Sequence, residues 1–324
     1  MSNGGAPIRV YFLGSGSLGV PILERLADDP VILITGAGTQ PDRPQGRHRR
    51  LAPTPLGEAA VALGLVADKP LNVNAPEVVD RLRALALDLI VVVSYGQLLR
   101  APLLALPRCG CLNVHASLLP RHRGAAPIQA AIQYGDAETG ISFMRMDAGL
   151  DTGPVYGQVR LPLCGRETAM DLQVALAGLA AGQIVRWVRA ICHEGLQPAP
   201  QPTAGATVAR KITKEQGRLD WRLDANLLGR QVRAFNPWPG SWFDLPTAKG
   251  RRRLLVTAAV VEPVPEARAP GVVFQADQNG WRVACGQGAL RIERVVPEGR
   301  GEMAAAEFLR GCLVVPGTRL ETQS

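Results

Sequence analysis

The sequence signals that decide the fold are concentrated in residues 111–140, which read CLNVHASLLPRHRGAAPIQAAIQYGDAETG. The apolar run 111–114 is typical of a β-strand, and residues 127–134 are typical of a helix that begins at a proline and ends at Gly135. A strand that is followed by a loop and a helix is the repeating unit of open α/β sheets. In such sheets the ligand crevice lies at the carboxyl ends of the strands.

Two polar residues, Asn113 and His115, occupy alternate positions of this strand. Alternate residues of a strand point to the same face of the sheet, so the amide and the imidazole should lie side by side. A second strand-like run, 141–146, leads into the turn-rich segment DAGLDTGP, which carries Asp147 and Asp151. The pattern predicts an amide and an imidazole at the carboxyl end of one strand, with two aspartates on a later turn.

Alternating strand and helix patterns continue from the N-terminus to about residue 150, which predicts a Rossmann-like, doubly wound and mostly parallel sheet. Residues 88–94, DLIVVVS, form the most continuous apolar run, as expected of a central strand that is buried on both faces. Residues 170–192 are typical of a long amphipathic helix that closes this domain. The other expected strands are residues 8–14, 31–37 and 66–71, and the other expected helices are residues 20–27, 56–64 and 76–86.

The composition changes after this helix. Residues 194–208, EGLQPAPQPTAGATV, are rich in Pro, Gly, Ala and Gln, have little to bury and are typical of a linker. Beyond them, short strand-like runs with turn residues between them indicate a small, OB-like β-barrel. We therefore predict a catalytic domain at 1–193, a linker at 194–208 and a barrel domain at 209–324.

The composition favours a protein that folds without metal ions or disulfides. The 324 residues are 47% hydrophobic, and the six cysteines form neither a CxxC pair nor a zinc-type spacing with the four histidines. The N-terminus does not read as a secretory signal, and no run of about 18 uncharged apolar residues reads as a membrane span. We expect a monomeric, cytoplasmic protein with reduced thiols, no metal and no membrane partner.

The net charge of +8 is unevenly distributed. Residues 205–324 hold 18 Lys and Arg against 12 Asp and Glu, whereas residues 1–204 hold 18 against 16. A basic surplus of this kind suits a polyanion such as a nucleic acid, because Lys and Arg neutralise phosphates. It equally suits a composition that keeps a protein soluble, so charge alone leaves both interpretations open.

The runs NVHASLLPRHRGAAPIQ and DAGLDTG closely resemble the signature of the folate-dependent formyltransferases. Later runs, KITKEQGRLDW and AFNPWPGSW, extend the resemblance over nearly the whole chain. It implies formyl transfer from 10-formyltetrahydrofolate to the amino group of methionyl-initiator tRNA, with Asn113, His115 and Asp151 as the catalytic residues. The folate-binding residues that it implies are Ser117, Leu118, Leu119, Pro120, Tyr95 and Gly96.

The resemblance also implies that residues 40–50, QPDRPQGRHRR, reach the acceptor stem of the tRNA. On the residues alone, prolines and a glycine among arginines predict an exposed loop that can form neither helix nor strand, and a merely solvated loop remains open. The barrel would supply further contacts to tRNA phosphates. The tRNA-binding residues that we predict are Arg43, Arg47, Arg49, Arg50, Arg251, Arg252 and Arg253.

The N-terminal turn GSGSLG matches the dinucleotide pattern at Gly14, Gly16 and Gly19. The acidic residue that should follow is Asp42, which lies in a proline-rich loop, so we interpret the glycines as close strand-to-helix packing. We also expect turn strain if Gly16 is changed to alanine. Formyltransferases usually carry a Gly-Thr-Pro run here, so this turn departs from the pattern.

Formyl transfer to an amine needs a neutral amine, donors for the oxyanion and a route for the proton. Asn113 and His115 can supply donors, and Asp151 can either orient the imidazole or accept the proton, which the sequence leaves open. Three alternative functions are a nicotinamide oxidoreductase, a module that only binds nucleic acid, and a formyltransferase for a purine precursor or an amino sugar. The first rests only on GSGSLG, and the second leaves the polar trio unexplained. In the third class, a purine-precursor enzyme would need no second domain, and the amino-sugar enzymes lack the basic segment 40–50 combined with a C-terminal barrel.

Overall fold

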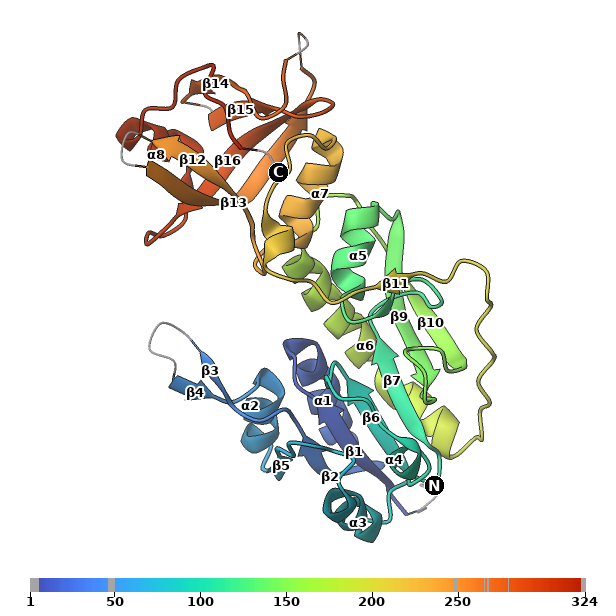
Figure 1. Cartoon of the computed structure of the whole chain (residues 1–324). Coiled ribbons are helices and arrows are strands. Elements are labelled where there is room, and N and C mark those ends of the chain that lie inside the picture. The colour runs from blue at the N-terminus through green and yellow to red at the C-terminus, as the bar shows by residue number, and fades with distance from the viewer. Residues whose placement is uncertain are drawn as a thin grey trace. The chain divides into compact units, whose positions relative to one another are not determined.

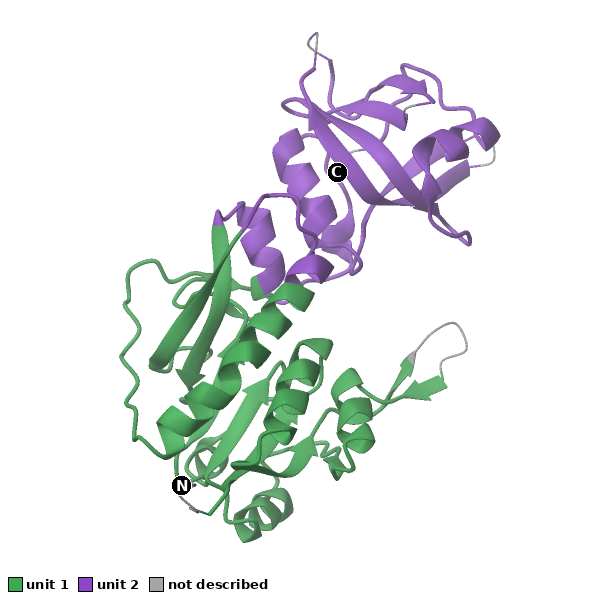
Figure 2. Cartoon of the chain, turned by 180° about the vertical axis from the view of Figure 1, so that it is seen from behind, with its two compact units in different colours: residues 1–127, 138–162, 173–209 green, residues 128–137, 163–172, 210–324 purple. Residues whose placement is uncertain are grey.

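The computed structural model describes residues 6–45, 50–247, 250–264, 266, 268–278 and 280–321. The chain divides into two compact units, coloured separately in Figure 2. Unit 1 comprises Met1–Pro127, Glu138–Pro162 and Gln173–Ala209, and unit 2 comprises Ile128–Ala137, Leu163–Leu172 and Arg210–Ser324. Two short segments that lie within the predicted catalytic domain, 128–137 and 163–172, thus belong to unit 2.

Unit 1 is built on a seven-stranded sheet with the order β10-β9-β7-β6-β1-β2-β5 (Figure 1). Strands β7, β6, β1, β2 and β5 are parallel, whereas β9 is antiparallel to both β7 and β10. The prediction of a Rossmann-like, mostly parallel sheet is confirmed. The strands are β1 (Ile8–Gly14), β2 (Ile32–Gly38), β5 (Ala67–Asp68), β6 (Leu89–Val93), β7 (Cys111–His115), β9 (Glu138–Arg145) and β10 (Val155–Pro162).

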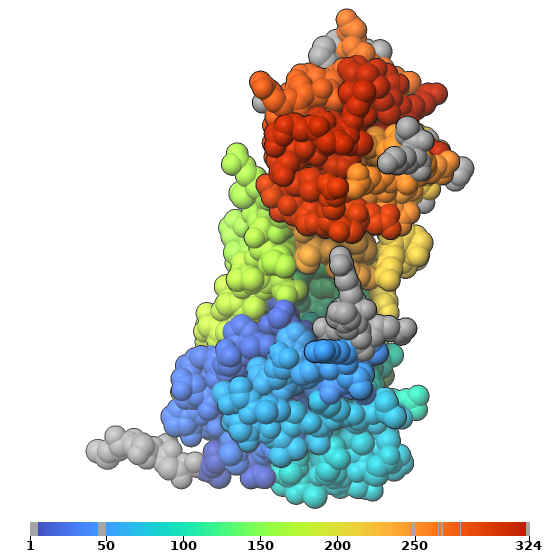
Figure 3. Space-filling view, turned by 90° about the vertical axis from the view of Figure 1, so that its left-hand side faces the viewer, coloured from blue at the N-terminus to red at the C-terminus, as the bar shows by residue number. Residues whose placement is uncertain are grey.

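Helices connect these strands and cover the sheet. In the space-filling view, α2 and the segment after it, in light blue, form part of the surface of unit 1 (Figure 3). The helices are α1 (Val20–Ala27), preceded by a 3-10 turn (Ser17–Gly19), α2 (Pro55–Ala62), α3 (Pro76–Ala84), α4 (Ala101–Leu104) and α6 (Ala169–Cys192). Helix α5 (Pro127–Tyr134) also follows β7 in the chain, but from Ile128 onward it belongs to unit 2.

The glycine-rich turn after β1 serves close packing. A Cβ on Gly14 would lie 2.9 Å from the Val93 carbonyl oxygen and 3.1 Å from the Leu56 side chain. Gly16, by contrast, has φ −80°, and the nearest atom to its Cβ would be 3.8 Å away. The expectation of turn strain at Gly16 is therefore wrong, because an L-residue adopts this backbone conformation without cost.

Helix α6 combines length with an apolar composition. By these two criteria it is the one helix among the described residues that could cross a membrane, although no such run was expected from the sequence. Its stripe at every fourth residue, Leu176, Ala180, Ile184 and Val188, is fully buried inside unit 1. This buried stripe is the face that an amphipathic helix turns toward a protein core, as the sequence pattern predicted.

Three local expectations are wrong. Residues 40–50 were expected to form neither helix nor strand, but β3 (Arg43–Gln45) and β4 (Arg50–Ala52) pair as an antiparallel ribbon. A ribbon of two strands consists only of edges, where a proline such as Pro44 is tolerated because its missing N–H is not needed. The strand expected at 66–71 has only two residues, and β10 had no counterpart among the expected strands.

The segment expected to be a linker lies along unit 1. Val155 and Ala199 exchange two backbone hydrogen bonds of 2.8 and 2.9 Å. Further on, β11 (Val208–Ala209) pairs in parallel with β8 (Arg123–Gly124). The segment is therefore hydrogen-bonded to unit 1 near both of its ends.

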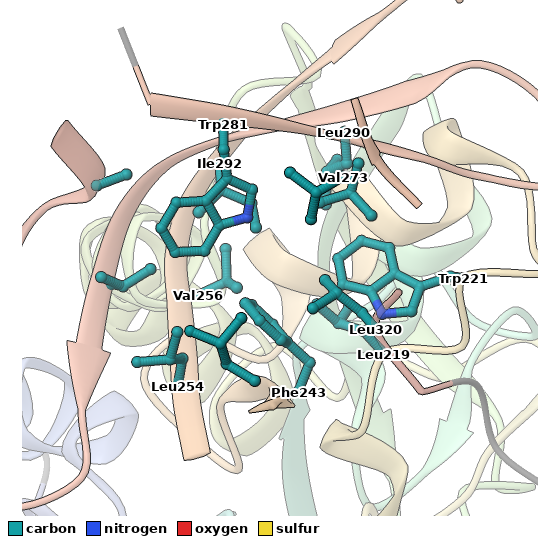
Figure 4. Close-up of a cluster of buried hydrophobic side chains, with 14 of the residues drawn as sticks. Leu219, Trp221, Phe243, Leu254, Val256, Val273, Trp281, Leu290, Ile292 and Leu320 are labelled. Atoms are coloured by element: carbon teal, nitrogen blue, oxygen red, sulfur yellow. The ribbon is translucent and has the colours of Figure 1, made fainter. Parts of the chain in front are cut away.

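Unit 2 contains a six-stranded, antiparallel sheet that forms the predicted small barrel. Its core is aromatic: Phe243 packs edge-on against both Trp221 and Trp281, with centroid separations of 5.6 and 6.1 Å (Figure 4). All three rings are buried, which gives this small domain a large apolar interior. The elements are α7 (Ala225–Ala234), β12 (Ser241–Thr247), β13 (Gly250–Glu262), β14 (Val273–Asp277), β15 (Gly280–Ala284), β16 (Ala289–Pro297), β17 (Met303–Ala304), α8 (Ala305–Gly311) and a 3-10 turn (Glu215–Gly217).

Candidate active site

Strand β7 carries the first two members of the predicted trio. It lies between parallel β6 and antiparallel β9, and all five of its residues are buried. Asn113 lies opposite Met144 and His115 opposite Ser142, so the two polar side chains share one face of the sheet. Their exposed fractions are 9% and 6%, which means that both polar groups need partners within the protein.

The third member, Asp151, completes the cluster from the turn between β9 and β10. Its carboxylate accepts hydrogen bonds from the Gly124 backbone N–H at 2.7 Å and from Asn113 Nδ2 at 3.2 Å. One carboxylate oxygen also lies 3.7 Å from His115 Nδ1. Asp151 has φ +52°, an uncommon conformation for a residue with a side chain. The structure thus brings together all three residues that the sequence singled out.

The protonation of His115 follows from its other contact. Nε2 lies 3.0 Å from the backbone carbonyl oxygen of His122. A carbonyl oxygen can only accept, so Nε2 must carry a hydrogen. In the neutral ring Nδ1 is then unprotonated, and it is this atom that faces Asp151. Nδ1 and the carboxylate together form a place where a proton can be taken up and shared.

Gly124 completes the environment of the carboxylate. Its φ is +109°, and a Cβ would lie 2.7 Å from the Ala209 carbonyl oxygen. A side chain at this position would therefore push β8 away from β11 and move the N–H that donates to Asp151. The glycine in RHRGAAP is required by both the backbone angle and the lack of space.

Comparisons with known proteins agree with this geometry. The formyl transferase family matches residues 8–188, and its C-terminal domain family matches residues 211–313. Methionyl-tRNA formyltransferase from Aromatoleum aromaticum is 42% identical, with 98% of both chains covered. The enzyme of the same name from Thiobacillus denitrificans is 44% identical over 97% of this chain and 99% of its own. The chain belongs to the methionyl-tRNA formyltransferase family.

A protein with much lower sequence identity has a similar fold. HypX from Aquifex aeolicus, in complex with tetrahydrofolic acid, is 16% identical and has a TM-score of 0.60. The match covers 94% of this chain and 47% of HypX. At this identity the likeness concerns the fold alone.

The SLLP segment follows β7, and Ser142 on β9 binds its backbone through two hydrogen bonds. The Ser142 hydroxyl donates to the Ser117 carbonyl at 2.7 Å and accepts from the Leu119 N–H at 3.0 Å. Gln158 Nε2 donates to the Leu119 carbonyl at 2.7 Å and to the Ser142 hydroxyl at 2.8 Å. Ser117 and Leu119 are buried, whereas Leu118 and Pro120 are partly exposed. The side chains available to a ligand are thus Leu118 and Pro120.

Tyr95 and Gly96 follow β6, whose carboxyl end adjoins that of β7. The Tyr95 carbonyl accepts from Ser15 Oγ at 3.2 Å and from Gln40 Nε2 at 3.1 Å. Its ring is buried, and burial raises the pKa of the Tyr95 hydroxyl to about 12. This tyrosine stays neutral at physiological pH and contributes shape rather than charge.

Among the described residues, the trio is accompanied by neither a reactive thiol nor a metal-binding cluster. Burial raises the pKa of the Cys111 thiol, on β7, to about 12, so it is not a nucleophile at neutral pH. Within the described part of the chain, no group of three or more His, Cys, Asp or Glu residues could hold a metal ion. Asp42, the weak partner of the glycine pattern, pairs with Lys69 at 2.6 Å.

The predicted tRNA-binding arginines fall into two sets. Arg43 on β3 lies opposite Ala52, and Arg50 on β4 lies opposite Gln45; both arginines are exposed. Arg47 and Arg49 lie outside the described residues. The exposed ribbon suits contact with a large ligand.

The other set does not share one surface. Arg251 and Arg253 point to one face of β13, where the Arg253 guanidinium stacks on Trp242 at 3.6 Å. Arg252 points to the opposite face and lies over the Phe308 ring at 5.5 Å. The three arginines do not share one face, because neighbouring residues of a strand alternate between its faces. That all three bind tRNA stays a prediction.

Arg251 instead belongs to a different cluster. It lines a groove of about 780 Å³ in unit 2, together with Arg218, Arg222 and Arg319. The acidic residue of this groove, Glu321, pairs with Arg251 at 2.6 Å and lies 3.6 Å from Arg218. Arg222 also pairs with Asp220 at 2.7 Å, so four guanidinium groups are set against two carboxylates and the groove keeps a net positive charge.

Sequence reasoning missed several residues that hold the site. Ser142, Gln158 and His122 were not singled out, and neither were Gln201 and Thr207 in the expected linker. His122 and Gly124 lie inside the RHRGAAP motif, which could have drawn attention to them. Gln201 and Thr207 carry no such signal, because the segment around them has no periodicity and a composition typical of linkers.

Proposed function

We propose that Asn113, His115 and Asp151 catalyse transfer of the formyl group of 10-formyltetrahydrofolate to the amino group of methionyl-initiator tRNA. Formyl transfer is the activity of the family, and this reaction begins translation with formylmethionine. The observation that carries the assignment to these residues is the contact of Asp151 with both polar side chains of β7. Such a cluster, at the carboxyl end of the sheet, is where a doubly wound fold places its chemistry.

The reaction needs one proton acceptor and one donor. The amine nitrogen attacks the formyl carbon, a new C–N bond forms and the carbonyl oxygen becomes an oxyanion. The Asp151 carboxylate and His115 Nδ1 take the proton that the amine loses. When the tetrahedral intermediate collapses, the bond between the formyl carbon and N10 of the folate breaks, and N10 receives from His115 and Asp151 the proton that they took from the amine. The products are formylmethionyl-tRNA and tetrahydrofolate, so atoms and charges balance.

The hydrogen bonds of the trio favour this division of roles. One N–H of the Asn113 amide donates to Asp151, which leaves the second available for the oxyanion. The Nε2 hydrogen of His115 is already donated to the His122 carbonyl. His115 therefore acts in proton transfer through Nδ1, and Asn113 is the side chain of the trio that stabilises the oxyanion.

Recognition of the tRNA requires surfaces beyond the trio. We assign the β3–β4 ribbon, through Arg43 and Arg50, to the acceptor end of the tRNA. The groove around Arg251 supplies positive charge for phosphates, whose contacts give salt-sensitive affinity that depends little on sequence. We place the leucine and proline side chains of the SLLP segment against the folate. The enzyme acts as a monomer in the cytoplasm.

One assay tests the function. The purified chain is incubated with 10-formyltetrahydrofolate and either methionyl-initiator tRNA, methionyl-elongator tRNA, free methionine or a nucleotide-linked amino sugar. Formylation of the initiator tRNA at a kcat/KM at least about 100-fold above the other acceptors supports the proposal. Arg43→Ala should lower that ratio without changing the KM for the folate. Equal formylation of the amino sugar would contradict the proposal.

A further inference from the structure

The segment from 199 to 209, which we call the strap, lies along unit 1 beside the candidate active site. The strap lies between the two regions that match the family models, because the first region ends at residue 188 and the second begins at residue 211. Ala199 bonds to Val155 just after the Asp151 turn, and β11 bonds to β8 just after His122. Between these two attachments the strap extends one half-buried side chain, Gln201, to the turn.

The Gln201 amide is fully used. Nε2 donates to the carbonyl of Asp151 at 2.8 Å and to the carbonyl of Gly153 at 2.7 Å. Oε1 accepts from Arg123 Nε at 3.1 Å and from Nη2 at 2.7 Å. The side chain thus joins the turn of the catalytic carboxylate to the residue that precedes Gly124, whose N–H binds that carboxylate.

We propose that Gln201 is a positioning residue for formyl transfer, which fixes the Asp151 carboxylate through the main chain of its turn. This inference rests on the proposed role of Asp151. Asp151 has φ +52°, a conformation that persists only where surrounding contacts impose it. Two hydrogen bonds to the carbonyls of Asp151 and Gly153 supply such a restraint, since each contributes about 0.5–1.5 kcal/mol.

The strap also contacts the histidine side of the trio. The Thr207 hydroxyl accepts the His122 backbone N–H at 2.8 Å. His122 is buried with φ +56°, and its carbonyl accepts His115 Nε2. The two ends of the strap therefore support the two partners between which the proton is shared, one through Gln201 and one through Thr207.

The test uses two substitutions of Gln201 in the full chain. Gln201→Met keeps the length and removes every hydrogen bond of the amide. Gln201→Glu keeps acceptors for Arg123 but replaces the donor to the two carbonyls by an oxygen. Gln197→Met is the matched control, because Gln197 lies in the same connecting segment and its amide donates to the nearby Gly195 carbonyl, at 2.9 Å.

Both Gln201 variants should lower kcat by about tenfold to 100-fold, as expected when a catalytic group is misplaced by about 1 Å. The KM values for folate and tRNA should stay within about twofold, and Gln197→Met should match the wild type. A Gln201→Glu enzyme with wild-type kcat would overturn the proposal, because the donor to the turn would then be dispensable. Raised KM values with unchanged kcat would also overturn it and would indicate a purely structural role.

A second measurement does not depend on the reaction. Amide hydrogen exchange of the segment 147–153 should be about tenfold faster in Gln201→Met than in the wild type or in Gln197→Met. Unchanged exchange would show that Gln201 does not hold the turn. If the wild type failed to formylate methionyl-tRNA, the proposed function would fall, whereas the exchange result would still decide whether Gln201 fixes the Asp151 turn.

Discussion

Replacement of Asp151 by asparagine is the sharpest test of the trio, because the carboxylate faces two hydrogen-bond donors. These are the Gly124 N–H at 2.7 Å and Asn113 Nδ2 at 3.2 Å. The asparagine amide has one oxygen, so only one donor keeps an acceptor and the other meets an NH₂ group. Asn113 can restore the contact by turning its own oxygen toward residue 151, but it then withdraws the N–H that is meant for the oxyanion.

The magnitude follows from these two losses. Removal of the proton acceptor costs about 10²–10⁴ in rate, and loss of an oxyanion donor costs about 10²–10³. Because the two groups act as one unit, the effects should not multiply, and we expect kcat to fall by about 10³–10⁴. Exchange of a charged for a neutral acceptor lowers the free energy of unfolding by about 1–2 kcal/mol, which lowers the melting temperature by roughly 5 °C.

The assay is single-turnover formylation with saturating folate and methionyl-tRNA, accompanied by a thermal melt. Asp147→Asn is the control: Asp147 accepts from the Gly149 N–H at 3.0 Å and from the Thr152 hydroxyl at 2.9 Å, within the same turn. It should lower kcat by less than about tenfold, since no charge next to His115 is lost. A kcat for Asp151→Asn within tenfold of the wild type would refute the role of the carboxylate as proton acceptor.

Three further outcomes can be measured by thermal unfolding and steady-state kinetics. Gly124→Ala should lower the free energy of unfolding by about 1–3 kcal/mol and reduce kcat, because φ is +109° and the Cβ would lie 2.7 Å from a carbonyl of β11. Gly14→Ala should lower the free energy of unfolding by a similar amount, because its Cβ would lie 2.9 Å from a carbonyl oxygen of β6. Gly16→Ala should change the melting temperature little. A larger loss of stability for Gly16→Ala than for Gly14→Ala would contradict the packing argument. Arg251→Ala should raise the KM for tRNA and flatten its salt dependence, but Arg252→Ala, on the other face of β13, should do neither.

The sequence predicted the sheet and the trio because both depend on local, periodic signals. Asn113 and His115 were placed on one face by the two-residue period of a strand, and the structure has them there. The β3–β4 ribbon escaped prediction because proline and arginine depress strand propensity, while a free ribbon only needs its inner hydrogen bonds. Strand β10 escaped because its residues at the sheet edge are half exposed, so the apolar alternation is weak.

Gln201 could not have been found in the sequence for a different reason. Its partners are two main-chain carbonyls and an arginine that lies 78 positions earlier in the chain. Contacts to backbone atoms leave no complementary residue type to recognise, and the surrounding prolines and glycines are typical of a linker. Side chains that bind backbone are therefore the part of a site that composition and spacing do not reveal.

The position of the Asp151 carboxylate thus depends on three segments that are distant in the sequence. Strand β7 supplies the Asn113 amide, the RHRGAAP turn supplies the Gly124 N–H, and the strap holds the main chain of the turn. A left-handed aspartate costs about 1–3 kcal/mol, and hydrogen bonds from all three segments help to offset that cost. The carboxylate is consequently ordered by unit 1 as a whole, up to Ala209, rather than by the DAGLDTG motif alone. Because that unit includes the strap, the connection to the barrel is part of the framework that aligns the proton acceptor with His115.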